Sequence, residues 1–123
     1  MKKSVMMLLS VLAFIMFVNV QTVNAQDKKE EWPGVTKKVL TDNDKVNVSE
    51  VTFAPGAVAD WHSHPEYSVY AVTSVKMKTE IKGVADAIVE LKAGQVGWSE
   101  AVMHKTTNIG TKPFTVIVTE IKP

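Results

Sequence analysis

The sequence of 123 residues contains no cysteine. Without thiols the chain forms neither disulfide bonds nor thiolate metal sites or iron–sulfur clusters, and it has no cysteine nucleophile. It also lacks the cysteine that carries the lipid of a bacterial lipoprotein. A single apolar core must therefore stabilise the folded protein, which is feasible for a domain of roughly a hundred residues.

Arginine is absent as well, so all 14 basic residues are lysines. A lysine ammonium cannot offer the two parallel hydrogen bonds with which a guanidinium holds a phosphate or carboxylate. This disfavours nucleotide and phosphate substrates. The formal net charge is only +1, with 13 acidic residues. The chain therefore lacks the excess of positive charge that is typical of proteins that bind nucleic acid or an anionic membrane.

Residues 1–25 have the features of a secretory signal peptide. Two lysines precede an apolar run over residues 5–18, and the segment ends in the small residues "VNA". The apolar run is short for a bilayer span of about 20 residues, which argues against the alternative of a membrane anchor. We predict cleavage after Ala25 and a soluble periplasmic or secreted protein. Loss of the two lysines changes the formal charge of the mature chain, residues 26–123, from +1 to −1.

The mature chain begins with a charged segment and continues with a pattern of period two. Residues 26–34, "QDKKEEWPG", end in Pro-Gly, and we predict a flexible N-terminal arm there. Apolar and polar residues then alternate over residues 46–53, 75–82 and 85–91. A β-branched run, "FTVIVTEI", follows near the C-terminus.

Turn signals such as "APG", "KAG" and "NIGTKP" separate these runs. Short strands with regular turns predict one all-β domain over residues 35–123, either a sandwich or a barrel. The segment "KGVADAIVELK" also contains good helix formers. The strand before it and the turn signal at Gly83 favour a hairpin.

Two of the three histidines, His62 and His64, lie in the stretch "WHSHPEY". On a strand their side chains point to the same face. Two imidazoles on one face can reach a single divalent ion at about 2.0–2.2 Å each. Solvated histidines beside a turn show the same pattern, so the pair alone leaves both interpretations open.

The surroundings of these histidines resemble the first sequence motif of the cupin family. In that motif a glycine is followed, after five residues, by His-x-His, and "GAVADWHSH" has this spacing from Gly56. The second cupin motif contains a glycine, a histidine and an asparagine four residues after the histidine. It corresponds here to Gly94, His104 and Asn108. The resemblance covers about residues 48–121 and implies a small antiparallel β-barrel of the jelly-roll type, with a single metal ion in its mouth.

The chain departs from the cupin pattern at one position that matters for the metal. The family's first motif has a glutamate after the second histidine, where this chain has Ser68 or Val69. Glu66 is the nearest carboxylate and is a candidate fourth ligand beside the three histidines. Lys92 also stands where the second motif prefers proline.

Three histidine ligands leave coordination positions open for water or a substrate, as in catalytic metal sites. Iron, manganese, nickel, copper and zinc all accept imidazole nitrogen, so the sequence does not select the metal. Some proteins of this fold have a degenerate site and only bind a ligand. Tyr70, Met77, Trp98 and Met103 are candidate pocket residues, although alternating apolar residues of a small barrel are more often plain core.

Two hypotheses for the function follow from the resemblance. The first is an exported metal-dependent enzyme of the dioxygenase, isomerase or lyase type that acts on a small molecule. Because all histidines are assigned to the metal, general acid or base catalysis then falls to Glu66, Tyr67 or metal-bound water. The second is a non-catalytic periplasmic module that binds a metal or a small ligand. For either we expect a homodimer, since small β-domains often pair edge strands or faces across a two-fold axis.

Overall fold

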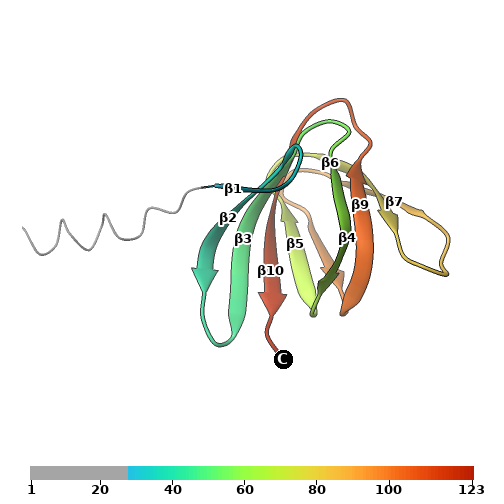
Figure 1. Cartoon of the computed structure of the whole chain (residues 1–123). Helices are drawn as coiled ribbons and strands as arrows, with labels where there is room; N and C mark the ends of the chain where they lie inside the picture. Colours follow the sequence, from blue (N-terminus) through green and yellow to red (C-terminus); the bar gives the residue numbers. More distant parts are fainter. Residues whose placement is uncertain (1–27) are drawn as a thin grey trace, which may run out of the picture.

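The structure is a computed structural model that describes residues 28–123 (Figure 1). The predicted signal peptide and the first residues of the predicted arm lie outside the described residues. Residues 28–123 form ten β-strands and no α-helix, so this part of the chain has no helix long and apolar enough to cross a membrane. The strands are β1 (Lys29–Trp32), β2 (Val35–Asp42), β3 (Val46–Phe53), β4 (Val58–His64), β5 (Tyr67–Ala71), β6 (Val75–Glu80), β7 (Ala87–Leu91), β8 (Val96–Ser99), β9 (Val102–Asn108) and β10 (Phe114–Ile121).

The strands form two antiparallel sheets (Figure 1). A six-stranded sheet has the order β1-β2-β3-β10-β5-β8, and a four-stranded sheet has the order β4-β9-β6-β7. The predicted all-β class with antiparallel pairing is thereby confirmed. The predicted closed barrel is not found, because the hydrogen-bonded ladders of residues 28–123 leave the two sheets separate. The edge strands are β1 and β8 of the larger sheet and β4 and β7 of the smaller sheet. No hydrogen-bonded ladder joins the edges of the two sheets, so the architecture is a jelly-roll-like sandwich.

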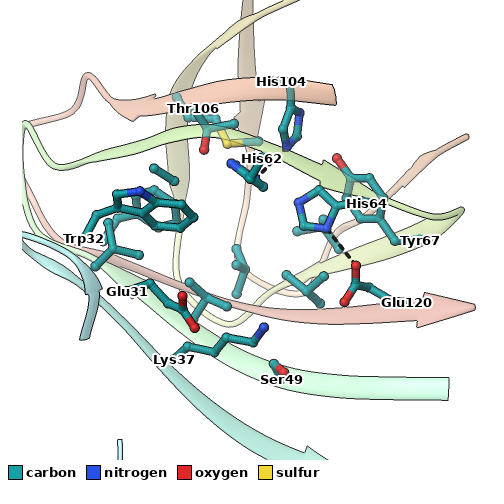
Figure 2. A pocket seen from close by; sticks show the side chains of 18 of the residues that line it. Glu31, Trp32, Lys37, Ser49, His62, His64, Tyr67, His104, Thr106 and Glu120 are labelled. Carbon is teal, nitrogen blue, oxygen red and sulfur yellow. Dashed lines mark hydrogen bonds and ion pairs between the residues drawn. The ribbon is translucent and has the colours of Figure 1, made fainter. Parts of the chain in front are cut away.

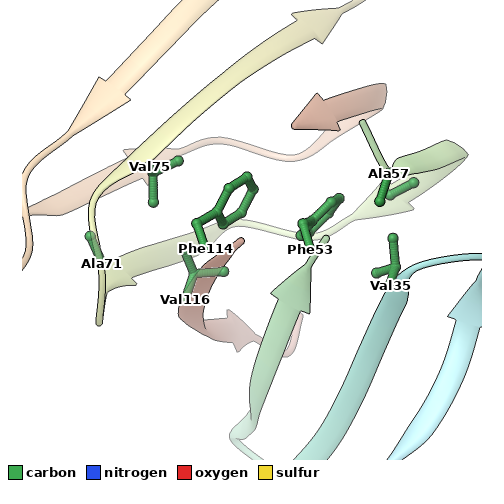
Figure 3. Packing of buried hydrophobic residues seen from close by; sticks show 8 residues of the cluster. Val35, Phe53, Ala57, Ala71, Val75, Phe114 and Val116 are labelled. Atoms are coloured by element: carbon green, nitrogen blue, oxygen red, sulfur yellow. The ribbon is translucent and has the colours of Figure 1, made fainter. Parts of the chain in front are cut away.

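The apolar core lies between the sheets, on the inward face of the six-stranded sheet (Figure 3). Val35, Phe53 and Phe114 are cross-strand neighbours there, and each is at least 93% buried. The two phenylalanine rings stack at a centroid distance of 4.8 Å. Because burial of one such side chain contributes about 1.5–3 kcal/mol, this row supplies a large part of the stability of the domain.

Part of the segment predicted as an arm is an edge strand. β1 pairs with β2, with Lys29 opposite Lys37, and Gly34 with a φ of 78° makes the turn between the two strands. Trp32 packs against the core cluster, which explains why a segment with so many charges is ordered. Its indole also lies beside the ring of His62, with 5.2 Å between the ring centroids, so β1 reaches the first of the three histidines.

Candidate metal centre

The three histidines come from two neighbouring strands of the four-stranded sheet. His62 and His64 lie on β4, and His104 lies on β9 directly opposite His62 in the ladder. Strand alternation turns all three side chains toward the space between the sheets, where their ring centroids are 4.6–5.1 Å apart (Figure 2). One nitrogen from each ring lies within 4.8 Å of the other two. The predicted three-histidine group that could hold a metal ion is thus confirmed.

In both His62 and His64 the Nδ1 atom is engaged by an oxygen acceptor, so Nε2 is the nitrogen that can bind a metal. Nδ1 of His62 donates to the carbonyl oxygen of Asp60 at 2.6 Å, and Nδ1 of His64 donates to the carboxylate of Glu120 at 2.9 Å. A proton on Nδ1 leaves Nε2 with a lone pair, as a metal ligand requires. Nε2 of His62 lies 3.1 Å from Nε2 of His104. Two nitrogens bound to one ion at about 2.0–2.1 Å are about 2.8–3.4 Å apart at octahedral or tetrahedral angles, so the His62 and His104 nitrogens have the spacing of two ligands of one divalent ion.

The environment favours the neutral form of the His104 and His62 imidazoles. Burial, together with the positive charge that His62 or His64 would carry, lowers the pKa of His104 to about 4. Burial also lowers the pKa of His62. Only a deprotonated nitrogen can bind a metal, so at neutral pH these two side chains need not lose a proton first.

Glu120 is the functional residue that the sequence analysis did not identify. It lies near the end of β10, opposite Tyr67 of β5, and Figure 2 shows its carboxylate bonded to His64. A carboxylate that accepts the Nδ1 proton of a metal-binding histidine fixes the tautomer and orientation of the ring. Glu120 is in phase with the buried Val116 and with Val118 on β10. The sequence therefore contained one sign of this residue: a carboxylate at a position of the strand that otherwise faces the core.

The two residues proposed for acid–base chemistry lie in different surroundings. Glu66 is exposed on the turn between β4 and β5, and the group of potential metal ligands does not include it. Tyr67 is 92% buried, and its ring lies 4.5 Å from that of His64 between centroids. Burial chiefly, and the nearby Glu120 carboxylate, raise the pKa of Tyr67. Its hydroxyl therefore keeps its proton at neutral pH beside the histidines.

A cavity of about 280 Å³ lies against the three histidines, between the sheets (Figure 2). Met77 and Tyr67 contribute to its wall, and both also line a second cavity of about 190 Å³, where Trp98 stands at the outer side. Tyr70 and Met103 line neither cavity and are 45% and 50% exposed. Each is one residue out of phase with an inward-facing neighbour, so strand alternation turns it to the outer face.

The residues matched to the two cupin motifs are joined by hydrogen bonds. The amide of Gly56 donates to the carbonyl of Asn108, and the amide of Asn108 donates to the carbonyl of Ala57. Gly56 and Gly94 have φ values of 76° and 89°, a region that favours glycine. The Asn108 side chain is fully buried and donates to the carbonyls of Phe53 and Lys112. Gly56 and Asn108 thus link the turn before β4 to the end of β9, whereas Gly94 lies in the turn between β7 and β8 and donates to the carbonyl of Ala71.

Comparison with solved structures shows a cupin fold. A cupin domain from Bordetella pertussis Tohama I has a TM-score of 0.68 and 29% identity, over 77% of this chain and 100% of that domain. An RmlC-like cupin from Shewanella frigidimarina has a TM-score of 0.60 and 21% identity, over 80% of this chain and 85% of that one. KdgF from a Halomonas species has a TM-score of 0.59 and 19% identity, over 79% and 89% of the two chains. No protein-family model and no curated protein matches the sequence.

Proposed function

We propose that this chain is an exported member of the cupin family, that it binds one divalent transition metal through His62, His64 and His104, and that it acts on a small molecule in the adjoining cavity. The observation that carries the proposal is the convergence of three imidazoles, two with Nδ1 already engaged, on one point at the wall of a cavity. Three protein ligands with open positions are typical of a metal that takes part in chemistry.

Family membership is supported by two independent observations. The fold is that of cupin domains, and one of them is 29% identical over its whole length. The histidines of the two matched motifs, far apart in the sequence, meet in space at 3.1 Å between nitrogens. Fold alone does not select a reaction, so the reaction class rests on the site.

The chain's own residues have distinct roles in this proposal. A bound metal would supply Lewis acidity or a centre for oxygen chemistry, within the dioxygenase, isomerase or lyase classes. Glu120, which accepts the Nδ1 proton of His64, would hold the ring so that Nε2 is available to the ion. Tyr67, protonated and buried beside His64, is suited to donate a hydrogen bond or a proton to a substrate oxygen. Glu66 would act only from the exposed turn that follows β4.

The location and assembly of the protein are also part of the proposal. The leader-like residues 1–25 support export to the periplasm or the medium. The near-neutral charge and the absence of arginine support a small-molecule ligand rather than nucleic acid. We propose a homodimer, which sedimentation would test: a mass equal to one chain would contradict it.

Metal content tests the central claim. We expect the purified protein, after incubation with iron, manganese, zinc or copper and removal of free metal, to retain about one ion per chain by elemental analysis. His62→Ala and His104→Ala each remove one of three ligands and should lose that ion. Glu66→Gln, which changes an exposed carboxylate on the turn directly after β4, is the control and should retain it. A wild-type protein that holds no metal after loading would refute the proposed site.

Loss of metal in the Glu66→Gln control would have a different meaning. It would show that the turn after β4 supplies a fourth ligand, as the sequence alone suggested. Turnover of a panel of small oxygen-containing compounds by the loaded protein, with oxygen consumption recorded, then distinguishes an enzyme from a binding protein.

A further inference from the structure

Lys37 lies on the inward face of the six-stranded sheet, where a charged residue is unexpected. On β2 it is in phase with Val35, which is 99% buried, and in the ladder it stands opposite Val51 of the core-facing row. Figure 2 shows its side chain extending into the cavity from the wall opposite the histidines. An ammonium group in an apolar setting is costly unless a partner compensates it. Violations of the inward-apolar pattern of this kind are expected at functional sites.

The part of the chain that the structure describes supplies no ion-pair partner for this charge. None of the ion pairs within residues 28–123 includes Lys37. Of the two carboxylates that line the same cavity, Glu120 is held by His64, and Glu31 is exposed at the rim. Lys37 and the three histidines line the same cavity from opposite walls (Figure 2).

The charges around the cavity favour an anion. Three neutral imidazoles leave a bound divalent ion its charge of +2, and Lys37 adds +1 against −1 from Glu120 and −1 from Glu31 at the rim. The sum is positive whether or not Glu31 is counted. Small anions gain most where such charge is shielded from water.

Most of the remaining wall is apolar, and its uncharged polar residues are Ser49, Ser63, Tyr67 and Thr106. The apolar residues that surround Lys37 and the histidines include Val35, Val51, Phe53, Val69, Phe114, Val116 and Val118. Such walls stabilise a ligand through the apolar area they remove from water. They offer no further cation to a second charged group. A ligand that satisfies both features carries one negative charge and an apolar body.

We propose that the ligand of this cavity is a small monocarboxylic acid whose carboxylate pairs with Lys37 and whose hydrocarbon part lies against the apolar wall beside the three-histidine group. The positive charge sum includes the metal and therefore rests on the proposed function, whereas the position of the Lys37 ammonium group in the cavity does not. Lys37 thus selects anionic over neutral ligands of the same shape. An ion pair of this kind typically changes affinity about ten-fold to a hundred-fold.

Calorimetric titration with hexanoate and with hexanamide, which is similar in shape but uncharged, tests the proposal. We expect the zinc-loaded wild type to bind hexanoate at least ten-fold more tightly than hexanamide. Lys37→Met keeps the length of the side chain and should abolish this preference without changing the zinc content, while Lys37→Arg should retain part of it. Lys38→Met, one residue along β2 and outside the cavity lining, is the matched control and should behave as the wild type.

The same titration on metal-free protein separates the two proposals. If the protein binds no zinc but still prefers hexanoate in a manner that depends on Lys37, the metal site is wrong and the anion site stands. Equal affinity for hexanoate and hexanamide in the wild type, no detectable binding of either, or an unchanged preference in Lys37→Met would each overturn the role assigned to Lys37.

Discussion

Replacement of Glu120 gives the sharpest test of how the metal centre is built. The Glu120 carboxylate accepts the Nδ1 proton of His64 at 2.9 Å, with both side chains only about a fifth exposed, at 20% and 18%. Loss of such a partner behind a metal-binding histidine typically weakens metal affinity about 10–100-fold. That range corresponds to about 1.4–2.7 kcal/mol. The reason is that a hydrogen bond to a charged acceptor is strong. Without this bond the His64 ring could rotate away from the orientation that the metal requires.

Two substitutions divide this effect into charge and geometry. Glu120→Gln keeps an oxygen that can accept the proton but removes the charge, so we expect about a ten-fold loss of affinity. Glu120→Ala removes the acceptor as well and should approach a hundred-fold loss. Competition for Zn²⁺ or Co²⁺ against a chromophoric chelator measures both values. Glu80→Gln is the control, because the side chain of Glu80 is similarly exposed, at 24%, and lies outside the histidine cavity.

A double-mutant cycle decides whether Glu120 acts through His64. In a His64→Ala background the ring that Glu120 orients is gone, so Glu120→Gln should no longer change the affinity for Zn²⁺. A persistent loss in that background would mean that the carboxylate binds the ion itself or acts only through its charge. Wild-type affinity in both Glu120 variants would refute the positioning role altogether.

Three further predictions concern stability. Because burial lowers the pKa of His104 to about 4 while an unfolded histidine titrates near pH 6.5, the unfolded chain binds the proton first as the pH falls. The free energy of unfolding of the metal-free protein, measured by urea titration, should therefore decrease as the pH falls from about 6.5 to 4. The expected decrease is about 1–2 kcal/mol after allowance for solvent screening, and the His104→Gln variant should not show it. Asn108→Ala removes the amide group that donates to the carbonyls of Phe53 and Lys112. It should lower the free energy of unfolding by about 2–4 kcal/mol in the same assay. A decrease below 1 kcal/mol would contradict the assigned hydrogen bonds. In Gly56→Ala the added Cβ meets no atom within 4 Å, but the residue must adopt a φ of 76°. The variant should therefore lose about 1–2 kcal/mol of stability and have a lower Tm. An unchanged Tm would show that the turn relaxes.

The strands of the domain could be predicted because one face of each sheet is buried, which forces a period of two. This held for residues 46–53 and 75–80, and also for residues 87–91, where helix-forming residues competed with the pattern. It failed for β1, because only Trp32 of that strand packs against the core and the other three residues are exposed. Closure into a barrel was wrongly expected, because alternation is the same in a sandwich and in a barrel. The difference lies in hydrogen bonds between edge strands, which a local pattern does not encode.

The histidine group could be predicted because each of the two cupin-like motifs is a short continuous stretch of sequence that includes a glycine turn. Its supporting residues could not be found in that way. Glu120 follows His64 by 56 residues and reaches it from the opposite sheet, and Lys37 enters the cavity from β2. Their positions depend on which strands pair and which faces oppose each other. The only local sign was a charge in phase with apolar neighbours, as in "VTK" from Val35 and "VTE" from Val118.

The inward face of the six-stranded sheet changes from apolar to polar residues along its strands, and the candidate site lies toward the polar end. The row that contains Phe53 and Phe114 is apolar and tightly stacked. The row at the other end pairs Glu120 with Tyr67, and the intermediate rows contain Lys37 and Ser49 among valines. Burial at the first end supplies the free energy that lets the second end keep charged groups and open space between the sheets. Histidines on the facing sheet at that end therefore meet a carboxylate, a phenol and an ammonium, whereas the same histidines beside the phenylalanines would meet only core.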